Sequence, residues 1–383
     1  MTRIRALASD IEGPITVNDK GVEFSQQELP NGWELYVQLS QWIMSFVSTQ
    51  EVYVRDDDQT SIEFNAGDTV KWILPFLRAY GSDDESLEKF CKTDINLIPG
   101  ASKTYEHINS FMPTHLVTTS YKPHAVAVSD QLFLWNRKHF ASEVTLDGGI
   151  MPMREADQIN EIAQEILKLP TLEFDYNITH FADYDETTCD TLEAMDVILN
   201  EKLYSIESAR YLLTDAKICG GGGAGKAAAL DEIKNIHSNL YYHDMMFVGD
   251  SITDMGAMQY LNQEGGVTVS FNGSRFAVFN AQIGVISPHV AVTGVLAEAF
   301  SNLGKGELMQ LVNQWPIWRE NNEVLTQAHK KGYIGTETAR LAQPFFDENV
   351  PIVVKLTEEN RSAYLESSLE MRAEVRKDMA ELS

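Results

Sequence analysis

Two short apolar runs in this chain each end in acidic residues. The run Met245–Val248 leads through a glycine to Asp250 and, four positions later, to Asp254. Near the N-terminus, Ile4–Ser9 ends in the same way at Asp10-Ile11-Glu12-Gly13. Short, continuous apolar runs are typical of buried strands in a parallel sheet. Because ligands bind beyond the carboxyl ends of such strands, the pattern predicts that the two acidic ends form one site.

Further patterns place these two strands in an α/β core. A helix is predicted over Ser102–Asn109 and is followed by a strand over His115–Thr118. Residues Trp135–Thr145 complete the first part of the core. Later in the chain, a helix over Lys226–Ile236 leads to the second acidic strand, and Val267–Phe271 is one more strand. Helices that alternate with short apolar strands predict a Rossmann-like parallel sheet.

Three segments lie outside this core. Residues 17–97 carry aromatic side chains at spacings of three and four, which is typical of packed helices. Residues 150–211 are predicted to be a helical insertion, and residues 301–383 a C-terminal helical extension. The last helix has one apolar seam, which suits its own core or, as an alternative, a second copy of the chain in a homo-oligomer. The α/β core would then comprise residues 1–16, 98–149 and 212–300.

Composition and charge narrow the classes of function. The 383 residues are 44% hydrophobic, enough for a large packed core and more than one lobe. The chain has 30 Lys and Arg against 56 Asp and Glu, and a net charge of −26 disfavours nucleic acids and anionic membranes as partners. Three widely spaced cysteines exclude a disulfide framework and favour a reducing cytoplasm. No apolar run approaches the length of a membrane span.

The acidic strand ends suit a hard cation. Mg²⁺ binds a few carboxylates together with phosphate oxygens and water, and Asp10, Glu12, Asp250 and Asp254 could supply the carboxylates. Acidic residues are common at strand ends of an acidic protein, so either end alone would be weak evidence. The pair is stronger evidence because both ends follow apolar strands. A surface this negative also repels phosphorylated substrates, so a phosphate site would need a metal or a local positive charge.

A glycine-rich loop supplies a candidate cation. The sequence Gly220-Gly221-Gly222-Gly223-Ala224-Gly225-Lys226 matches most of a phosphate-binding P-loop, but Ala227 replaces the hydroxyl that would hold Mg²⁺. Alternatively, Lys226 lies at a helix N-terminus, where the ammonium and backbone N–H groups would face a phosphate. A flexible linker with a chance lysine is the third interpretation.

These residues occur in the order of four motifs that define the haloacid dehalogenase superfamily, which the chain resembles. Asp10–Gly13 stands in place of the first motif, and Val117–Ser120 contains the hydroxyl of the second. Lys226 is the third motif, and Gly249–Asp254 is the fourth. Among these enzymes the spacing is most similar to that of phosphoserine phosphatase. The resemblance covers about half of the chain, namely the core, and implies a HAD-like fold.

The resemblance implies a phosphatase mechanism. Asp10 would attack phosphorus to give an aspartyl phosphate, and Glu12 would act as general acid and then as general base. Many phosphatases of the family have Asp where this chain has Glu12. Thr119, with Ser120 as the alternative, and Lys226 would bind the transferring phosphoryl group. The remaining implied roles are binding of Mg²⁺ by Asp10, Asp250, Asp254 and the Glu12 carbonyl, and phosphate binding by Asn272.

The resemblance also implies that residues 17–97 form a cap, which would exclude water and select the leaving group. Arg55 and Arg78 are candidates for binding a substrate anion, although each is more often an ordinary surface or helix-end charge. His124 could face the site or be a solvated loop histidine.

The sequence therefore favours a Mg²⁺-dependent phosphomonoester hydrolase that acts on a small phosphorylated metabolite. One alternative is a non-catalytic or accessory protein that keeps the fold and binds a partner. A second alternative is a P-loop nucleotide binder at Gly220–Lys226.

Overall fold

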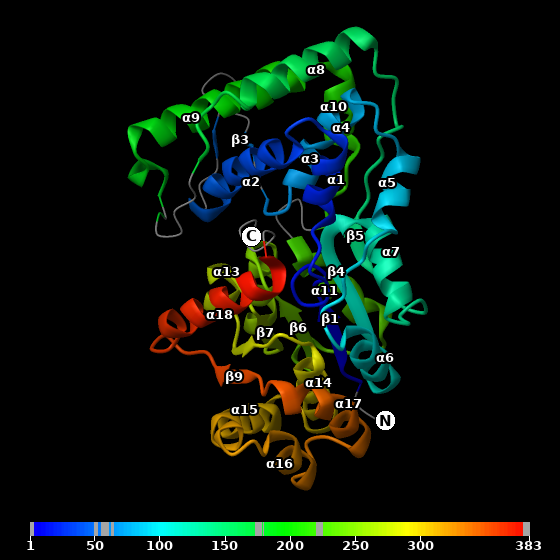
Figure 1. Cartoon of the computed structure of the whole chain (residues 1–383), viewed down its shortest axis with the longest axis vertical. Helices are drawn as coiled ribbons and strands as arrows, with labels where there is room; N and C mark the ends of the chain where they lie inside the picture. The colour runs from blue at the N-terminus through cyan, green and yellow to red at the C-terminus, as the bar shows by residue number, and fades with distance from the viewer. Residues whose placement is uncertain are drawn as a thin grey trace.

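A single sheet organises the core of the protein. The computed structural model describes residues 4–49, 53–54, 61–62, 65–172, 178, 180–219 and 225–377. Seven strands lie in the order β5-β4-β1-β6-β7-β8-β9 (Figure 1). Every neighbouring pair is parallel except β8 with β9, which is antiparallel. The strands are β1 (Ala6–Ser9), β4 (Thr114–Tyr121), β5 (Phe140–Ser142), β6 (Met245–Gly249), β7 (Val267–Phe271), β8 (Ile283–Ile286) and β9 (Ile352–Lys355).

Both faces of the sheet are buried, which explains the continuous apolar run of β6. Along β1, Leu7 packs into the cluster on one face, whereas Ala6 and Ala8 pack into the cluster on the other. A strand that is covered on both faces favours apolar side chains on both, and where β7 carries Thr268 and Ser270 these small polar side chains are buried as well. The predicted Rossmann-like parallel sheet is therefore confirmed. Its helices are α6 (Ala101–Phe111), α7 (Lys122–Gln131), α11 (Gly225–Ile236), α12 (Met255–Gln263), α13 (Arg275–Asn280) and α14 (Ala291–Leu303).

The two inserted segments build one helical lobe above the sheet (Figure 1). Trp42 and Phe76 from the first segment share a hydrophobic cluster with Ile159 and Leu199 from the second. The first segment contains α1 (Lys20–Glu28), α2 (Gly32–Thr49), β2 (Tyr53–Val54), β3 (Ser61–Ile62), α3 (Thr69–Trp72), α4 (Leu74–Ala79) and α5 (Asp84–Cys91). The second contains α8 (Met153–Ile166), the short helix Phe181–Asp183, α9 (Glu186–Asp196), the π-helix Val197–Leu203 and α10 (Glu207–Asp215).

The end of the second insertion differs from the prediction. The sequence pattern starts the return to the core at residue 212, but residues 212–215 finish α10, and Leu212 and Leu213 are buried in the cluster of the helical lobe. Two adjacent leucines fit a core strand or the buried face of a helix equally well, so the sequence alone could not place the boundary. The core therefore resumes after Asp215.

The C-terminal extension is mostly helical, as expected, but it also adds a strand to the sheet. β9 pairs with β8 from Ile283↔Lys355 to Ile286↔Ile352. The helices around it are α15 (Lys305–Glu320), α16 (Val324–Lys330), α17 (Thr336–Glu348) and α18 (Arg361–Arg376). Helix α18 packs against α13 and β8 of its own core. Two residues of the apolar seam predicted for the last helix, Met379 and Leu382, lie outside the described residues. None of the helices in the described ranges is long and apolar enough to cross a bilayer.

Candidate active site

The fold brings the two acidic strand ends together. Strands β1 and β6 are parallel neighbours, with Ser9 opposite Val248. The Asp10 N–H donates to the Val248 carbonyl at 2.9 Å, so Asp10 and Asp250 leave the same edge of the sheet. Both side chains are buried, with exposed fractions of 3% and 1%. The prediction that the two ends meet rests on strand order, and the observed order fulfils it.

The two loops after these strands touch, and a glycine allows the approach. Gly13 has φ of +100°, and a Cβ on it would lie 2.0 Å from the Asp250 Oδ2. Only glycine adopts this conformation without strain and leaves the space for the carboxylate. The first-motif loop is thus shaped around the aspartate of the fourth motif.

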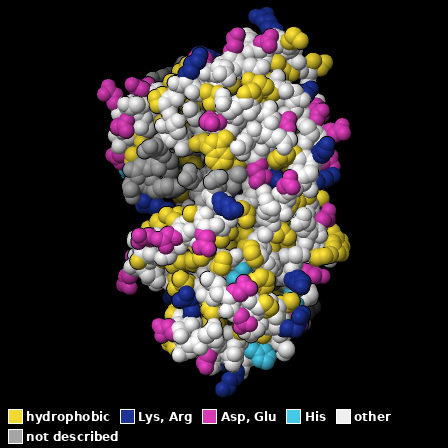
Figure 2. Space-filling model, in the orientation of Figure 1, with side chains coloured by type: hydrophobic (Ala, Val, Ile, Leu, Met, Phe, Trp, Pro, Cys, Tyr) yellow, Lys and Arg dark blue, Asp and Glu magenta, His cyan; other side chains and the backbone are white. Residues whose placement is uncertain are grey.

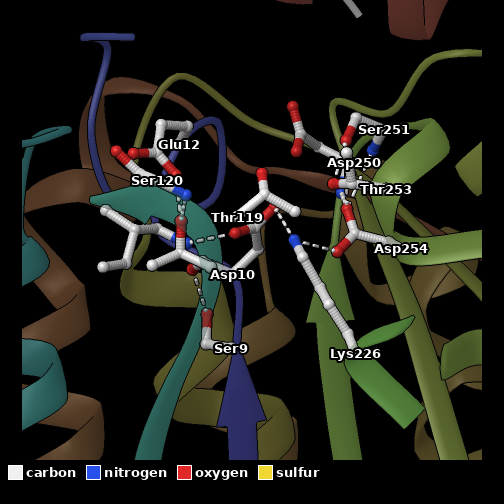
Figure 3. Close-up of polar contacts among 12 residues, drawn as sticks. Ser9, Asp10, Glu12, Thr119, Ser120, Lys226, Asp250, Ser251, Thr253 and Asp254 are labelled. Atoms are coloured by element: carbon white, nitrogen blue, oxygen red, sulfur yellow. Dashed lines mark hydrogen bonds and ion pairs between the residues drawn. The ribbon is translucent and has the colours of Figure 1, made fainter. Parts of the chain in front are cut away.

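Lys226 lies between two of the aspartates (Figure 3). Its Nζ is 2.6 Å from the Asp10 Oδ2 and 2.8 Å from the Asp254 Oδ1. The side chain is 1% exposed. Burial alone would lower the pKa of Lys226, but the Asp10 and Asp254 carboxylates raise it above its usual value, so the ammonium stays charged. Helix α11 starts at Gly225, which agrees with a lysine at a helix N-terminus.

The P-loop interpretation lacks its structural context. Residues 220–224 lie outside the described residues, but the segment before them is visible. It consists of helix α10, which ends at Asp215, and a single bridge between Lys217 and Glu143. A P-loop needs a buried strand at this position.

The aspartates form a suitable set of ligands for a divalent cation. Carboxylate oxygens of Asp10, Asp250 and Asp254 lie within 4.8 Å of one another. The Asp250 Oδ1 is buried and makes no hydrogen bond within the described part of the chain. Burial, and next the charge of Asp254, raise the pKa of Asp10 well above its usual value, which a bound cation would counteract. The donor atoms and the unsatisfied oxygen therefore fit Mg²⁺.

Asp254 also organises the backbone of its own loop. Its Oδ2 accepts hydrogen bonds from the N–H groups of Asp250 at 2.8 Å and Ser251 at 3.0 Å. These bonds fix the turn after β6, and the other oxygen, Oδ1, faces Lys226. The spacing of four between the two aspartates is what allows one carboxylate to hold the loop that carries the other.

Glu12 is held by two neighbours on the other side of the site. The Thr118 Oγ1 donates to the Glu12 Oε2 at 2.6 Å, and the His124 Nδ1 lies 3.0 Å from the Glu12 Oε1. Burial alone would raise the pKa of Glu12, but His124 and then Thr118 lower it to about 2. Glu12 is therefore a carboxylate at neutral pH. His124 is fully buried and faces the site, as one of the two sequence interpretations held.

The second-motif hydroxyls lie at the end of β4. Thr119 and Ser120 both line a cavity of about 80 Å³ together with Asp10 and Glu12. The Ser120 Oγ is also 3.2 Å from the His124 Nδ1. Strand β4 continues to Tyr121, beyond the predicted end at Thr118, so these hydroxyls belong to the strand itself.

Two of the other predicted phosphate and substrate contacts, Asn272 and Arg78, are bonded to groups other than the proposed site residues. The Asn272 amide donates to the Ser287 carbonyl at 2.7 Å and accepts from the Ser287 N–H at 2.9 Å, which occupies both ends of the side chain with backbone. Arg78 bonds the Ser82 carbonyl and lies 3.5 Å from Asp147, in the helical lobe. Arg55 lies outside the described residues.

Sequence reasoning missed two arginines that reach the site from the far end of the chain. The Arg372 guanidinium bonds the Asp250 Oδ2, and the Arg376 Nη1 lies 3.2 Å from the same oxygen. The side chains are 1% and 4% exposed. Their spacing of four predicts that they share one face of a helix, but nothing in the sequence connects that face with Asp250.

Comparisons with known proteins establish the fold. No protein-family model and no curated protein matches this chain. The chain is similar to the solved structure of gene product AF1437 from Archaeoglobus fulgidus, with a TM-score of 0.71, 19% identity and coverage of 99% of both chains. Structures of phosphoserine phosphatase also match. The phospho-aspartyl intermediate analogue has a TM-score of 0.41 at 12% identity and covers 73% of this chain and 91% of that one. The substrate complex has a TM-score of 0.42 at 14% identity and covers 74% and 93%.

The two kinds of match differ in weight. The phosphatase structures are too dissimilar to add to the argument, whereas AF1437 matches over essentially its whole length. At this identity the match concerns the fold alone. With the observed sheet, it confirms the predicted α/β fold, a mostly parallel, Rossmann-like sheet with helices on both faces and added helical segments.

Proposed function

We propose that the protein is a Mg²⁺-dependent phosphomonoester hydrolase that acts through an aspartyl phosphate on Asp10. The observation that carries the proposal is the 2.6 Å contact between Lys226 and Asp10, two residues that the sequence alone linked only through motif order. A carboxylate nucleophile next to a buried ammonium, under a cavity lined by hydroxyls, is suited to binding and attacking a phosphoryl group.

The chain's own residues account for the first step. A phosphate ester in the cavity would place its phosphoryl group near the Thr119 hydroxyl and the Asp10 carboxylate, which Lys226 contacts. Asp10 then attacks phosphorus, the bond to the leaving oxygen breaks as that oxygen takes a proton from water, and an acyl phosphate forms on Asp10. Bound at Asp10, Asp250 and Asp254, Mg²⁺ would offset the repulsion between the carboxylate and the phosphate dianion.

Glu12 provides the base for the second step. Water gives a proton to the Glu12 carboxylate and attacks phosphorus, the bond between phosphorus and the Asp10 oxygen breaks, and phosphate leaves with Asp10 restored. A pKa of about 2 suits this role better than donation of a proton to the leaving alcohol. Esters of more acidic alcohols, which leave without full protonation, should therefore react faster.

The cavity supports a small substrate. The cavity, of about 80 Å³, lies between the core and the helical lobe, which suits a small substrate. The helical lobe supplies part of the wall, including Tyr36 and Met44, which agrees with a cap that surrounds the leaving group. We infer a small phosphorylated metabolite as substrate and the cytoplasm as the compartment.

One observation favours the non-catalytic alternative. Two arginines already neutralise Asp250, so the protein could keep this fold without binding a metal. Such a protein would bind partners and would not turn over phosphate esters.

Hydrolysis separates the two possibilities. The purified protein would be assayed with p-nitrophenyl phosphate and a panel of phosphorylated metabolites, with Mg²⁺ and with a chelator. We expect Mg²⁺-dependent release of phosphate, lost in Asp10→Asn and kept in the control Asp157→Asn, which changes an exposed carboxylate on α8. No release above that of Asp10→Asn on any ester would reject the proposed function.

A further inference from the structure

The C-terminal helix α18 is built into the site. It packs on α13 and β8 of the core, and its C-terminal end lies close to the helical lobe (Figure 1). Four residues spaced by four, Tyr364, Ser368, Arg372 and Arg376, are all buried along one face. A spacing of four keeps side chains on one side of a helix. This face therefore follows a continuous path across the core.

The contacts along this face lead to the cavity. Tyr364 packs on Gly284 of β8, where it fills the space that a Cβ would occupy. The Ser368 Oγ donates to the Gly273 carbonyl at 2.8 Å. Arg372 bonds the Asp250 side chain and, at 3.4 Å each, the carbonyl oxygens of Asp250 and Asn272. Arg372 thus anchors the helix on the loop after β6.

Arg376, one turn later, both contacts Asp250 and lines the cavity. Among the described residues around that cavity, Asp10, Glu12 and Asp19 are acidic, and Arg376 is the one lysine or arginine. Lys226 does not line this cavity, but it contacts the Asp10 carboxylate at 2.6 Å. A phosphate ester that enters this cavity meets three carboxylates and one guanidinium.

We propose that Arg376 recognises the anionic oxygens of the substrate, so that the C-terminal helix completes the active site. An anion can leave water for a buried, acidic cavity only where a cation meets it. A guanidinium serves this purpose well because its planar fork of N–H groups matches phosphate and carboxylate oxygens. Arg372 is then a positioning residue that fixes the helix and Asp250.

This inference rests on the proposed function, because that function supplies the anionic ligand. Anion and cation binding should respond in opposite directions when Arg376 is lost. Affinity for an oxyanion should fall, since a charge-assisted contact disappears. Affinity for Mg²⁺ should not fall, because removing a positive charge beside Asp250 lessens the repulsion of the metal. A merely structural lesion would weaken both.

The experiment is calorimetric titration of the whole protein with Mg²⁺ alone and then with inorganic phosphate in saturating Mg²⁺. Arg376→Ala should weaken phosphate binding by about tenfold or more, and Arg376→Lys should retain part of the affinity. Lys377→Ala, which changes the exposed residue at the end of the same helix, is the matched control and should match the wild type. Thermal melts of each variant show that it is folded.

A second titration shows whether Arg376 binds the phosphoryl group or a carboxylate on the leaving group. If phosphate affinity is unchanged but a carboxylate-bearing phosphomonoester loses affinity relative to p-nitrophenyl phosphate, Arg376 contacts the leaving group, and the inference still holds. If neither ligand loses affinity, or if Mg²⁺ affinity falls in parallel, Arg376 is structural and the inference is wrong. A wild-type protein that binds phosphate through Arg376 without hydrolysing esters would reject the proposed function only. A wild type that binds neither ligand overturns both.

Discussion

After β1, the acidic side chains find their partners within the core. Asp10 contacts Lys226 at the start of α11, and Glu12 contacts His124 on α7. After β6, Asp250 is bound by Arg372 and Arg376 of α18, more than a hundred positions later in the chain. The first strand end is thus served by neighbouring elements of the sheet, whereas Asp250 at the second strand end depends on the C-terminal extension.

This difference assigns the two ends different tasks. Asp10 and Glu12 border the cavity with groups that can attack and transfer protons, so the β1 end carries the proposed chemistry. Asp250 keeps one oxygen without a hydrogen bond among the described residues and the other on arginines, so the β6 end is arranged for charge balance. Substitutions at the β1 end should change rates, and those at the β6 end should change binding and stability.

The largest effect is expected at Asp10. Asp10→Asn keeps the shape of the side chain but removes the nucleophile, so hydrolysis should be abolished while the fold is retained. Steady-state kinetics measure the loss of hydrolysis, and a thermal melt on the same sample shows whether the fold is retained. A variant with a tenth or more of wild-type turnover, a loss of only about 1.4 kcal/mol in barrier, would exclude Asp10 from this role.

Glu12 should have the next largest effect. Glu12→Gln removes the base and should lower kcat by about 10²- to 10⁴-fold, with an acyl phosphate that persists because its hydrolysis is slowed. Rapid quenching after mixing with substrate measures the trapped phosphate. Glu143→Gln, which changes an exposed carboxylate just after β5, is the control. Equal kcat in the two variants would contradict the assignment of Glu12.

At the β6 end, metal binding should appear as stability. Mg²⁺ at about 100 times its Kd should stabilise the folded state by about 2.7 kcal/mol, because it binds the native cluster and not the unfolded chain. Melts with and without Mg²⁺ measure the change. In the Asp250→Asn variant, Mg²⁺ should no longer raise the melting temperature, whatever the stability of the variant without the ion. The same shift in both proteins would show that the ion binds elsewhere on this acidic surface, where negative side chains are widely spread (Figure 2).

The smallest effect concerns the contact between the two ends. Gly13→Ala should destabilise the fold by about 1–3 kcal/mol, from strain at a positive φ and from the clash with the Asp250 carboxylate. Gly81→Ala is a matched control, because Gly81 has φ of +99° and a Cβ added to it would meet no atom within 4 Å. Urea unfolding should show a larger loss for Gly13. Equal losses would mean that the two loops do not constrain each other.

The parts of the site that the sequence predicted are those set by strand order. Apolar runs that end in Asp10 and Asp250, and a lysine before a helix, are local signals, and adjacent parallel strands bring them together. The Asn272 amide bonds the Ser287 backbone, a contact with no local signature, and the phosphate-binding role of Asn272 stays a prediction. Arg372 and Arg376 escaped for the same reason, since their role depends on where a distant helix packs.

The fold shows a similar division. The helical insertion predicted over residues 150–211 contains α8, whose buried Ile159, Ile162 and Ala163 follow a helical spacing that is distinctive over many residues. The sequence around Leu212 and Leu213 and the strand β9 were missed, since four or five apolar residues fit a strand or a helix equally well. That the two insertions share one core could not be predicted, because no local pattern reports which distant segments pack together.

The most direct test of the central claim is the binding of beryllofluoride, which stands in for the phosphoryl group on a carboxylate. With Mg²⁺ present, ¹⁹F NMR should show a bound signal for the wild type and none for Asp10→Asn, because the group attaches to that carboxylate. Lys226→Ala should weaken or abolish the signal, since the fixed cation opposite the anionic group is lost. A bound signal that persists unchanged in Asp10→Asn would contradict the assignment of Asp10 as the nucleophile.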